Sequence, residues 1–419
     1  MVIITTVLAT LLVVAVLRNL SGGDKQIHRE IARRYSVRDP DFIRAMSIAL
    51  GPTVVGGNRI EPLLNGDQIF ASMLQAIRSA RRTITFETYI YWSAEIGREF
   101  AEALAERARA GVKVHVLVDW LGGNKMDESY ISLMQAAGVE FRKYRPLRWY
   151  NLHRLNNRTH RKLLIVDGRV GFTGGVGIAE VWTGNAQDPE HWRDTHFRVE
   201  GPVVAQMQSA FLDNWIETTG AVLHGPDYYP ELEAAGSDSA QSFNSSPNNG
   251  SESMALMYLL SITAAEHSIL LASAYFIPDE MASKTLTDAL RRGVKVQIIT
   301  PGTHTDSETA RRASRARWGP LLEAGAEIYE YQPTMYHCKV FIVDGLMVSV
   351  GSTNFDPRSF HLNDEASLNI YDAEFARRAS DIFARDLALS RRISHAEWVR
   401  RPFREKLLER LASILGPLL

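Results

Sequence analysis

The second half of this chain repeats the first half. RARAGVKVHVLVD (107–119) corresponds to LRRGVKVQIIT (290–300), and THRKLLIVDG (159–168) corresponds to YHCKVFIVDG (336–345). A third pair, TFETYIYW (85–92) and LASAYFIP (271–278), follows the same order, and the offsets between matching residues stay between 177 and 186. Three ordered matches at a nearly constant offset indicate a duplicated unit.

The repeated unit alternates strands and helices. VKVHVLVD (112–119) and VKVQIIT (294–300) are rich in β-branched apolar residues, which is typical of buried strands. Each half reads as strand, helix, strand, helix, then a hairpin and a final helix. This order predicts an α/β fold, with one α/β/α sandwich domain in each half and pseudo-twofold symmetry between them.

Shifts in composition suggest where the domains begin and end. The segment 221–253 is rich in Gly, Pro, Ser and Asn and reads as a linker. At the C-terminus, apolar residues at helical spacing alternate with basic ones, which suits either a membrane surface or packing on the second domain. We expect an anchor at 1–20, a helical lead-in at 21–60, domains at 61–222 and 254–392 around a linker at 223–253, and an amphipathic tail at 393–419.

The N-terminal segment 1–17 carries no charge, and its length is at the lower limit for a membrane-spanning helix. We favour an uncleaved transmembrane anchor; a cleaved signal peptide and a buried helix are the alternatives. Basic residues follow the segment, so the positive-inside rule places the remaining chain in the cytoplasm.

Composition narrows the function classes. The formal net charge of −1 disfavours a nucleic-acid binder, which usually has a basic excess. Cys338 is the only cysteine, which excludes an intramolecular disulfide and a cysteine-rich zinc site. Neither an acidic cluster nor an HExxH sequence occurs, so we expect no metal and no cofactor.

Both halves carry a His-x-Lys motif at the same place in the repeat. Residues two apart share one face of a strand, so each histidine and its lysine point the same way. An imidazole can attack phosphorus, and a lysine offsets the negative charge that develops there. Asp, then Gly, follow each histidine at +7 and +14, giving His160, Lys162, Asp167 and Gly174 in the first half and His337, Lys339, Asp344 and Gly351 in the second.

The two motif aspartates each precede a glycine between apolar runs, which is a strong hairpin signal. Five strand residues, about 16 Å, separate each aspartate from its lysine, so we interpret Asp167 and Asp344 as mainly structural. After the turn the chain returns toward the histidine. Small residues there would let a phosphate approach the backbone; they are Gly174, Gly175, Gly351 and Ser352, followed by Asn354.

Two later carboxylates are candidates for orienting the imidazoles. Asp194 lies in HWRDTHFRV and Glu365 lies in HLNDEASLNI, 34 and 28 residues after the histidine of their own half. A nucleophilic imidazole needs a partner that fixes its tautomer. Ordinary surface ion pairs are the alternative reading.

HRKLLIVDG and HCKVFIVDGLMVSVGSTN resemble the paired motifs of the phospholipase D superfamily. ETYIYW, WRDTHFRVEGP and STNFDPRSFHLNDE narrow the resemblance to bacterial cardiolipin synthases, over about residues 60–419. The resemblance implies that both motifs meet in one site, that His160 forms a phosphohistidine and that His337 acts as general acid and base. It also counts Asp167 and Asp344 among the catalytic motif residues.

The resemblance further implies a phospholipid substrate at the bacterial inner membrane. Phosphatidylglycerol is the expected substrate, with phosphatidylethanolamine as an alternative phosphatidyl donor. The segments 141–158 and 310–318 combine basic and aromatic residues, and we expect them to line the mouth of the site; a solvated loop is the alternative for the first.

Several alternatives stay open. A hydrolase, either a phospholipase or a nuclease, would use the same two histidines. Gly177 stands where the second half has Asn354, and this departure suggests a non-catalytic lipid-binding module as a third hypothesis. The sequence does not indicate an oligomeric state.

Overall fold

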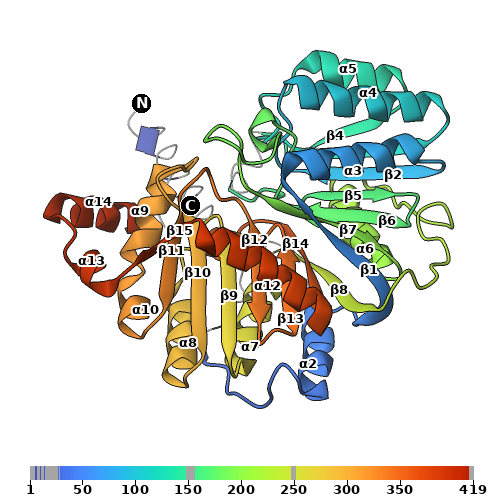
Figure 1. The fold of residues 1–419 in the computed structure, drawn as a ribbon. Helices are drawn as coiled ribbons and strands as arrows, with labels where there is room; N and C mark the ends of the chain where they lie inside the picture. The colour runs from blue at the N-terminus through green and yellow to red at the C-terminus, as the bar shows by residue number, and fades with distance from the viewer. Residues whose placement is uncertain are drawn as a thin grey trace.

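The computed structural model describes residues 29–147, 156–246 and 252–414, with isolated positions before residue 29. A single mixed sheet of fifteen strands runs through the molecule, with helices on both of its faces (Figure 1). The strands of the first half are β1 (Val55–Leu64), β2 (Thr83–Thr88), β3 (Lys113–Asp119), β4 (Glu140–Tyr144), β5 (Leu163–Val166), β6 (Val170–Gly174) and β7 (Thr195–Glu200).

The second half contributes eight strands. They are β8 (Asp238–Ser245), β9 (Ser268–Ser273), β10 (Lys295–Pro301), β11 (Glu327–Tyr331), β12 (Lys339–Val343), β13 (Met347–Gly351), β14 (Glu365–Tyr371) and β15 (Ser390–Ile393). The helices are α2 (Pro40–Leu50), α3 (Asn65–Ser79), α4 (Glu95–Arg109), α5 (Glu128–Ala136), α6 (Val204–Thr219), α7 (Ser253–Ala264), α8 (Glu280–Arg291), α9 (Glu308–Ala316), α10 (Gly319–Glu323), α11 (Pro357–His361), α12 (Ala373–Ala388), α13 (His395–Val399) and α14 (Phe403–Ile414).

The strand order is the same in both directions from the centre of the sheet. Outward from β1 it runs β7, β6, β5, β2, β3 and β4. Outward from β8 it runs β14, β13, β12, β9, β10 and β11, and β15 then closes that edge. The duplicated unit of the sequence is therefore a duplicated seven-strand pattern, and the alternation of strands and helices predicted for each half is confirmed.

Strands β1 and β8 join the two halves. They pair antiparallel, and Asn58 donates from its amide to the carbonyl of Asp238 at 3.0 Å. The Asp238 carboxylate in turn accepts the backbone N–H of Ile60 at 2.9 Å. Two sequence boundaries are corrected here: β8 lies inside the predicted linker 223–253, and β1 begins before the predicted domain boundary at residue 61.

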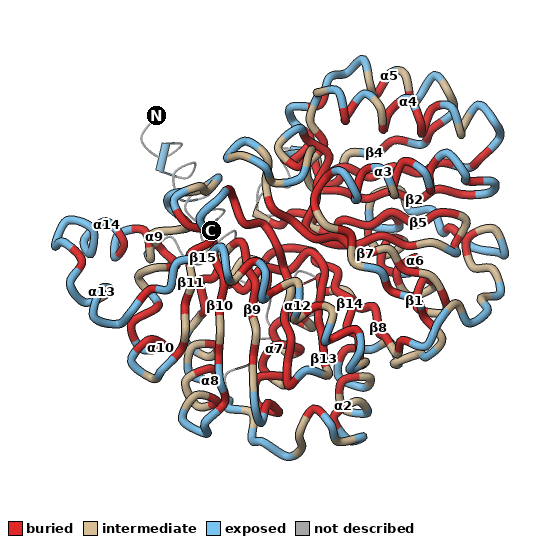
Figure 2. Tube along the Cα trace, viewed as in Figure 1, coloured by how far each residue is buried: buried red, intermediate tan, exposed pale blue. Residues whose placement is uncertain are grey.

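Three apolar clusters form most of the core. One packs α3, α4 and α5 on the first half of the sheet, and another packs α2, α7, α8 and α10 on the second half. The third lies on the opposite face and joins α6 of the first half to α12 of the second. Figure 2 shows the buried sheet running without a break between the halves, so each half completes the core of the other.

The two motif hairpins turn as the sequence predicts. Strands β5 and β6 connect through Asp167 and Gly168, which have φ values of 53° and 62°. Asp344 and Gly345, with φ values of 51° and 60°, connect β12 and β13 in the same way. Two successive left-handed residues give the turn that matches the twist of a tight hairpin, and Asp-Gly favours it.

The predicted anchor at 1–20 lies outside the described residues apart from isolated positions, as does most of the lead-in before residue 29. In the part of the chain that the structure describes, no helix has both the length and the apolar character needed to cross a membrane. Helix α2 of the lead-in packs Phe42, Met46 and Leu50 into the core of the second half.

Candidate active site

A cavity of about 250 Å³ lies where the two halves meet. Both motif histidines line it, together with aromatic and charged side chains from each half. The first half contributes Tyr89, Arg158, His160, Lys162, Trp182 and Trp192, and the second contributes Tyr275, Asp306, His337, Asn354, Asp356 and Arg358. The prediction that the two motifs meet in one site is confirmed.

Each histidine lies just before a hairpin strand and is held by the backbone of the other half. The N–H of His160 donates to the carbonyl of Asp364 at 2.8 Å. In the same way, the N–H of His337 donates to the carbonyl of Arg193 at 2.8 Å. These two backbone hydrogen bonds between the halves fix the backbone position of both histidines.

The carboxylate partners are exchanged between the halves. His160 Nδ1 lies 3.0 and 3.1 Å from the two carboxylate oxygens of Glu365. His337 Nδ1 lies 2.7 Å from Asp194 Oδ2. The sequence identified the right carboxylates, but each one serves the histidine of the other half, because each lies beside the motif strand across the interface.

Burial and charge decide the protonation of these pairs. Burial lowers the pKa of His160 to about 4, against the opposing charge of Glu365. Burial likewise lowers the pKa of His337, with Lys339 adding to the effect. Burial works against ionisation of Glu365 and Asp194, but the histidine partners bring both carboxyl pKa values below the ordinary range.

The resting site therefore holds neutral imidazoles beside ionised carboxylates. A carboxylate only accepts, so each Nδ1 carries the proton and donates it, which leaves Nε2 as the basic nitrogen. For His160, no hydrogen bond from another described residue reaches Nε2. For His337, Lys339 Nζ lies 3.2 Å from both ring nitrogens, so a cation lies against the imidazole without being aimed at Nε2 alone.

The two lysines are buried next to their histidines. Lys162 donates to the carbonyl of His160 at 2.7 Å, and Lys339 donates to the carbonyl of His337 at 2.8 Å. Burial lowers the pKa of Lys162 to about 7 and also lowers the pKa of Lys339. Two poorly solvated ammonium groups beside one cavity favour an anion in it, since a negative charge would replace their lost hydration.

Comparison with known proteins assigns the chain to a family. The family described as "Cardiolipin synthase, PLD-like domain" matches residues 73–215 and 258–387. The chain belongs to this family. It is 36% identical over 360 residues to cardiolipin synthase of Geobacillus kaustophilus, covering 85% of this chain and 72% of that protein. It is 33% identical over 380 residues to cardiolipin synthase A of Pseudomonas syringae, covering 90% and 78%.

A solved structure shares the fold. Phosphatidylserine synthase of Haemophilus influenzae superposes with a TM-score of 0.70 and 14% sequence identity, covering 91% of this chain and all of that one. The phospholipase D-like family and its fold, expected from the paired motifs, are therefore confirmed.

The family's motif aspartates lie away from the cavity. Asp167 accepts the backbone N–H groups of Arg81, Arg82 and Thr83 at 2.7 to 3.0 Å. Asp344 accepts three consecutive N–H groups at the start of β9, those of Glu266, His267 and Ser268, each at 2.8 Å. Each aspartate ties its hairpin turn to the start of the neighbouring strand, which agrees with the structural role inferred from spacing.

The small residues after the hairpins have a different role from the predicted one. Gly174, Gly175, Gly351 and Ser352 do not line the cavity. A Cβ on Gly175 would lie 2.4 Å from Asp194 Oδ1, and a Cβ on Gly351 would lie 2.4 Å from the carbonyl of Ala366. Their size makes room for a carboxylate and a neighbouring strand, not for a phosphate.

The two carboxylates are supported in different ways. In the second half, Ser352 donates its hydroxyl to Glu365. In the first half, the matching position is Gly175, and the indole N–H of Trp182 donates to Asp194 at 3.1 Å instead. Trp182 thus supports Asp194 in the way that Ser352 supports Glu365 in the second half. The spacing of residues in the sequence did not indicate this contact.

The departure at Gly177 is explained by packing. A Cβ at this position would lie 2.9 Å from Ile90 Cβ and 3.2 Å from the Trp182 ring. Gly177 therefore accommodates the tryptophan that supports Asp194. Its counterpart Asn354 lines the cavity, with an amide oxygen that is buried and has no hydrogen-bond partner within the described residues.

Aromatic rings flank both imidazoles. Tyr89 meets the His160 ring edge to face, with centroids 5.5 Å apart. Trp182 and Trp192 lie against His337, with centroids 5.3 and 5.5 Å away. These rings keep water from most of each imidazole, and their positions depend on long-range packing that the sequence did not reveal.

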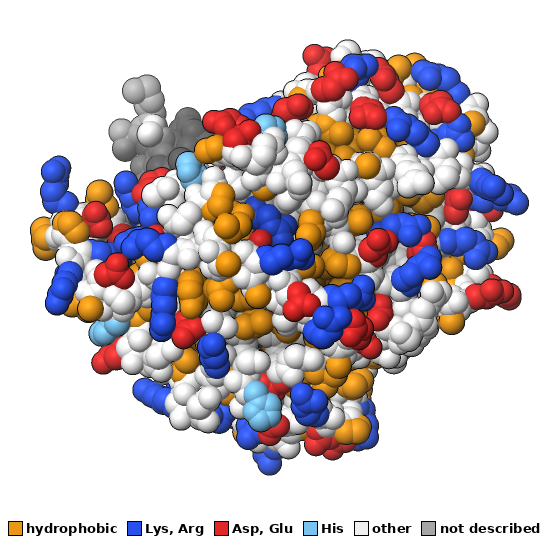
Figure 3. Space-filling model, viewed as in Figure 1, with side chains coloured by type: hydrophobic (Ala, Val, Ile, Leu, Met, Phe, Trp, Pro, Cys, Tyr) orange, Lys and Arg blue, Asp and Glu red, His pale blue; other side chains and the backbone are white. Residues whose placement is uncertain are grey.

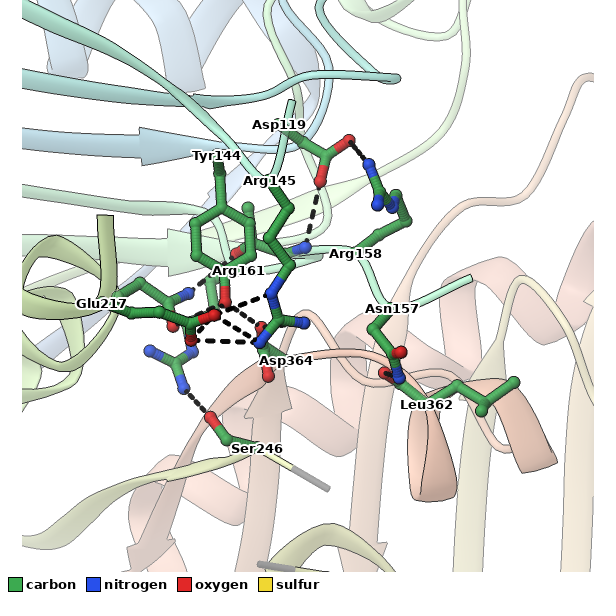
Figure 4. Close-up of polar contacts among 12 residues, drawn as sticks. Asp119, Tyr144, Arg145, Asn157, Arg158, Arg161, Glu217, Ser246, Leu362 and Asp364 are labelled. Carbon is green, nitrogen blue, oxygen red and sulfur yellow. Dashed lines mark hydrogen bonds and ion pairs between the residues drawn. The ribbon is translucent and has the colours of Figure 1, made fainter. Parts of the chain in front are cut away.

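A buried polar network behind the cavity connects the halves (Figure 4). The Tyr144 hydroxyl lies 2.6 Å from Asp364 Oδ2 and 3.0 Å from Glu217 Oε2, and it donates its one proton to the nearer carboxylate, that of Asp364. Arg161, which faces away from the cavity as its strand position predicts, donates to the Ser246 hydroxyl at 2.8 Å. Because Asp364 precedes Glu365, the network holds the partner of His160 in place.

Among the described residues, each of the two basic segments contributes one residue to the cavity lining. Of segment 141–158, residues 148–155 lie outside the described residues, and Arg158 lines the cavity. In segment 310–318, Ala310 lines the cavity, whereas Arg311 and Arg315 turn to the buried carboxylate of Glu330 at 2.9 and 2.8 Å. Arg311 and Arg315 thus serve a buried ion pair inside the second half and do not face the cavity.

Proposed function

We propose that this chain is a phosphatidyltransferase that makes cardiolipin from two phosphatidylglycerol molecules and releases glycerol. The observation that carries the proposal is the exchanged pair of histidine–carboxylate contacts around one cavity. Two imidazoles, each with its tautomer fixed from the opposite half, suit a two-step transfer at phosphorus. Membership of the cardiolipin synthase family supports the lipid substrate.

In the first step, Nε2 of His160 attacks the phosphorus of phosphatidylglycerol. A P–N bond forms, and the P–O bond to the glycerol headgroup breaks. The negative phosphodiester in the cavity raises the pKa of the nearby His337 imidazole, so Nε2 of His337 takes up a proton from solvent and then gives it to the departing glycerol oxygen. Lys162 and Lys339 offset the charge on the phosphoryl oxygens.

In the second step, a hydroxyl of a second phosphatidylglycerol attacks the same phosphorus. His337 removes the proton of that hydroxyl, the P–N bond breaks, and cardiolipin leaves with His160 restored. Water in place of the second lipid would give phosphatidic acid, which is the hydrolase alternative. Phosphatidylethanolamine would serve as donor with ethanolamine as the leaving group.

The assignment of His160 as nucleophile follows the family's paired motifs. The structure is compatible with it, because His160 Nδ1 faces Glu365 and its Nε2 has no hydrogen-bond partner among the described residues. Lys339 Nζ lies 3.2 Å from both ring nitrogens of His337 and lowers the pKa of that imidazole.

The proposal includes a place in the cell. An apolar N-terminal segment followed by basic residues suits attachment to the bacterial inner membrane, with the catalytic halves in the cytoplasm. This is also where the proposed lipid substrates are found.

Purified full-length protein in phosphatidylglycerol vesicles tests the function. We expect cardiolipin and glycerol in equal amounts, and no product from folded His160→Gln or His337→Gln protein. Phosphatidic acid as the main product, or cleavage of single-stranded DNA in its place, would overturn the transferase assignment. Substantial transfer by either histidine variant would overturn the site.

A further inference from the structure

The last helix of the described chain, α14, turns its apolar side chains outward. Phe403 is 78% exposed and Ile414 is 71% exposed. Leu407 and Leu411 lie between them on the same helical stripe, with Leu408 beside it, and all three are exposed. Figure 2 shows α14 as mostly exposed, and Figure 3 shows hydrophobic side chains at the edge of the molecule where α14 lies.

The inward face of α14 is held by ion pairs. Glu409 is only 3% exposed, and its carboxylate lies 3.1 Å from Arg315 Nε and 2.6 Å from Arg401 Nη1. Ala412, one turn away, is the other buried residue of the helix. The helix is thus the reverse of an ordinary surface helix, whose apolar stripe faces the core. Buried ion pairs fix its rotation with the leucines outside.

Helix α14 also lies next to the cavity. Ala412 packs in one small apolar cluster with Ala310 and Ala313 of α9 and with Ile277. Ala310 lines the catalytic cavity, as do Asp306 and Ser307 just before it. Helix α9 therefore lies between α14 and the cavity.

The charges beside the stripe are mostly positive. Arg404, Lys406 and Arg410 are exposed on α14, against one exposed acid, Glu405. Arg400 and Arg317 add exposed positive charge nearby. An apolar stripe flanked by basic residues matches the boundary between the headgroups and acyl chains of an anionic bilayer.

We propose that α14 is a bilayer-docking element: Phe403, Leu407, Leu411 and Ile414 enter the headgroup region of an anionic membrane and bring the cavity to its lipid substrate. The inference rests on the proposed function for the nature of the substrate. It concerns a surface whose residues do not line the catalytic cavity. A second protein copy fits less well, because it would bring together two faces with the same positive charge.

A fluorescent reporter on α14 tests this directly in the full-length protein. Leu411→Cys is labelled with an environment-sensitive dye; the native Cys338 is buried and its pKa is raised to about 12, so it reacts little. We expect a blue shift in phosphatidylcholine–phosphatidylglycerol vesicles and quenching by lipid-borne quenchers. The matched control is Ile48→Cys, on the exposed face of α2, which should show neither response.

Three outcomes contradict the proposal. One is a dye on α14 whose emission shows neither a blue shift nor quenching while the protein is bound to vesicles. Another is an equal response at both labelled positions. The third is a concentration-dependent shift without lipid, which would assign the face to a second copy. The reporter needs no turnover, so a quenched dye on a protein that makes no cardiolipin would refute the proposed function and leave the docking surface intact.

A triple variant links docking to activity. Phe403→Gln, Leu407→Gln and Leu411→Gln together should lower turnover of phosphatidylglycerol in vesicles at least about tenfold, through lost apolar insertion. Turnover of a monomeric short-chain phosphatidylglycerol should not change, since the cavity is untouched. Unchanged turnover on vesicles would overturn the proposal, as would an equal loss on both substrates.

Discussion

At the scale of single residues, the chemistry depends on a carboxylate from one half holding an imidazole from the other. Replacing Asp194 with Asn or Glu365 with Gln keeps the shape but lets the amide donate, which destabilises the reactive tautomer. We expect kcat to fall by about a hundredfold to ten-thousandfold in either variant, measured as cardiolipin formed from phosphatidylglycerol.

A histidine–aspartate pair outside the cavity provides the control. Asp188 accepts from His191 at the surface, so Asp188→Asn changes the same chemistry without touching the site. Its kcat should stay within about twofold of the wild type. Wild-type turnover in Asp194→Asn or Glu365→Gln would show that the exchanged pairs do not orient the histidines.

Burial of the site residues predicts an unusual pH profile. The nucleophile must be neutral, and the pKa of His160 is lowered to about 4, so kcat/KM should fall only as the pH drops toward 4. Lys162 must be charged and His337 must carry a proton. The pKa of Lys162 is lowered to about 7 and the pKa of His337 is lowered too, so kcat/KM should already be falling as the pH approaches 7. An acid limb near 6.5, the ordinary imidazole value, would contradict this. Short-chain phosphatidylglycerol is the substrate for the measurement.

The identity of the site residues followed from the sequence more readily than their partners did. The repeat identified His160, Lys162, His337 and Lys339, and triad logic added Asp194 and Glu365. Which carboxylate serves which histidine depends on how the two halves face each other, and spacing within one half carries no information on that. Trp182 was missed for a different reason: it lies in the same half as Asp194, and its contact depends on how the loop between them folds.

At the scale of elements, the motif aspartates stabilise the hairpins. Asp167→Ala and Asp344→Ala each leave three backbone N–H groups without their carboxylate. We expect each to lower the free energy of unfolding by about 2–4 kcal/mol in urea titrations, while kcat of the folded fraction stays within a few-fold. Asp41→Ala, which removes only an exposed ion pair with Arg44, should cost less than about 0.5 kcal/mol.

A loss of kcat without a loss of stability in the motif-aspartate variants would instead assign Asp167 and Asp344 a catalytic role. Their backbone contacts make this outcome incompatible with the structure.

Elements were predictable where their composition was apolar. Strands β3 and β10 were evident from their β-branched runs, and the β5–β6 and β12–β13 hairpins from Asp-Gly. Strand β8, DSAQSFNS, is mostly polar and was assigned to a linker. It forms because both of its edges are paired, with β1 on one side and β14 on the other, and pairing of this kind leaves no periodic signal in the sequence.

At the scale of the whole molecule, the two halves share a core and one sheet. Helices α6 and α12 meet in one apolar cluster across the β1–β8 junction. We therefore expect a single cooperative unfolding transition for the two halves. Hydrogen exchange should show the amides of β2 and β9 losing protection at the same urea concentration, and two separate transitions would contradict a shared core.

The duplication predicted the overall architecture, and the interface between the copies explains the function. One half alone holds a histidine without its carboxylate and a cavity without its second wall. Both repeats are needed to build one site, and the two repeats have the same order of seven strands.

The central claim is that one phosphorus atom is carried on His160 while His337 moves the protons. Rapid quenching of the reaction with phosphatidylglycerol in wild-type protein, followed by mass spectrometry of the peptides, tests it most directly. The predicted result is a phosphatidyl group on the peptide that contains His160. Absence of any phosphohistidine in wild-type protein that is turning over, or an adduct on the His337 peptide instead, would contradict it.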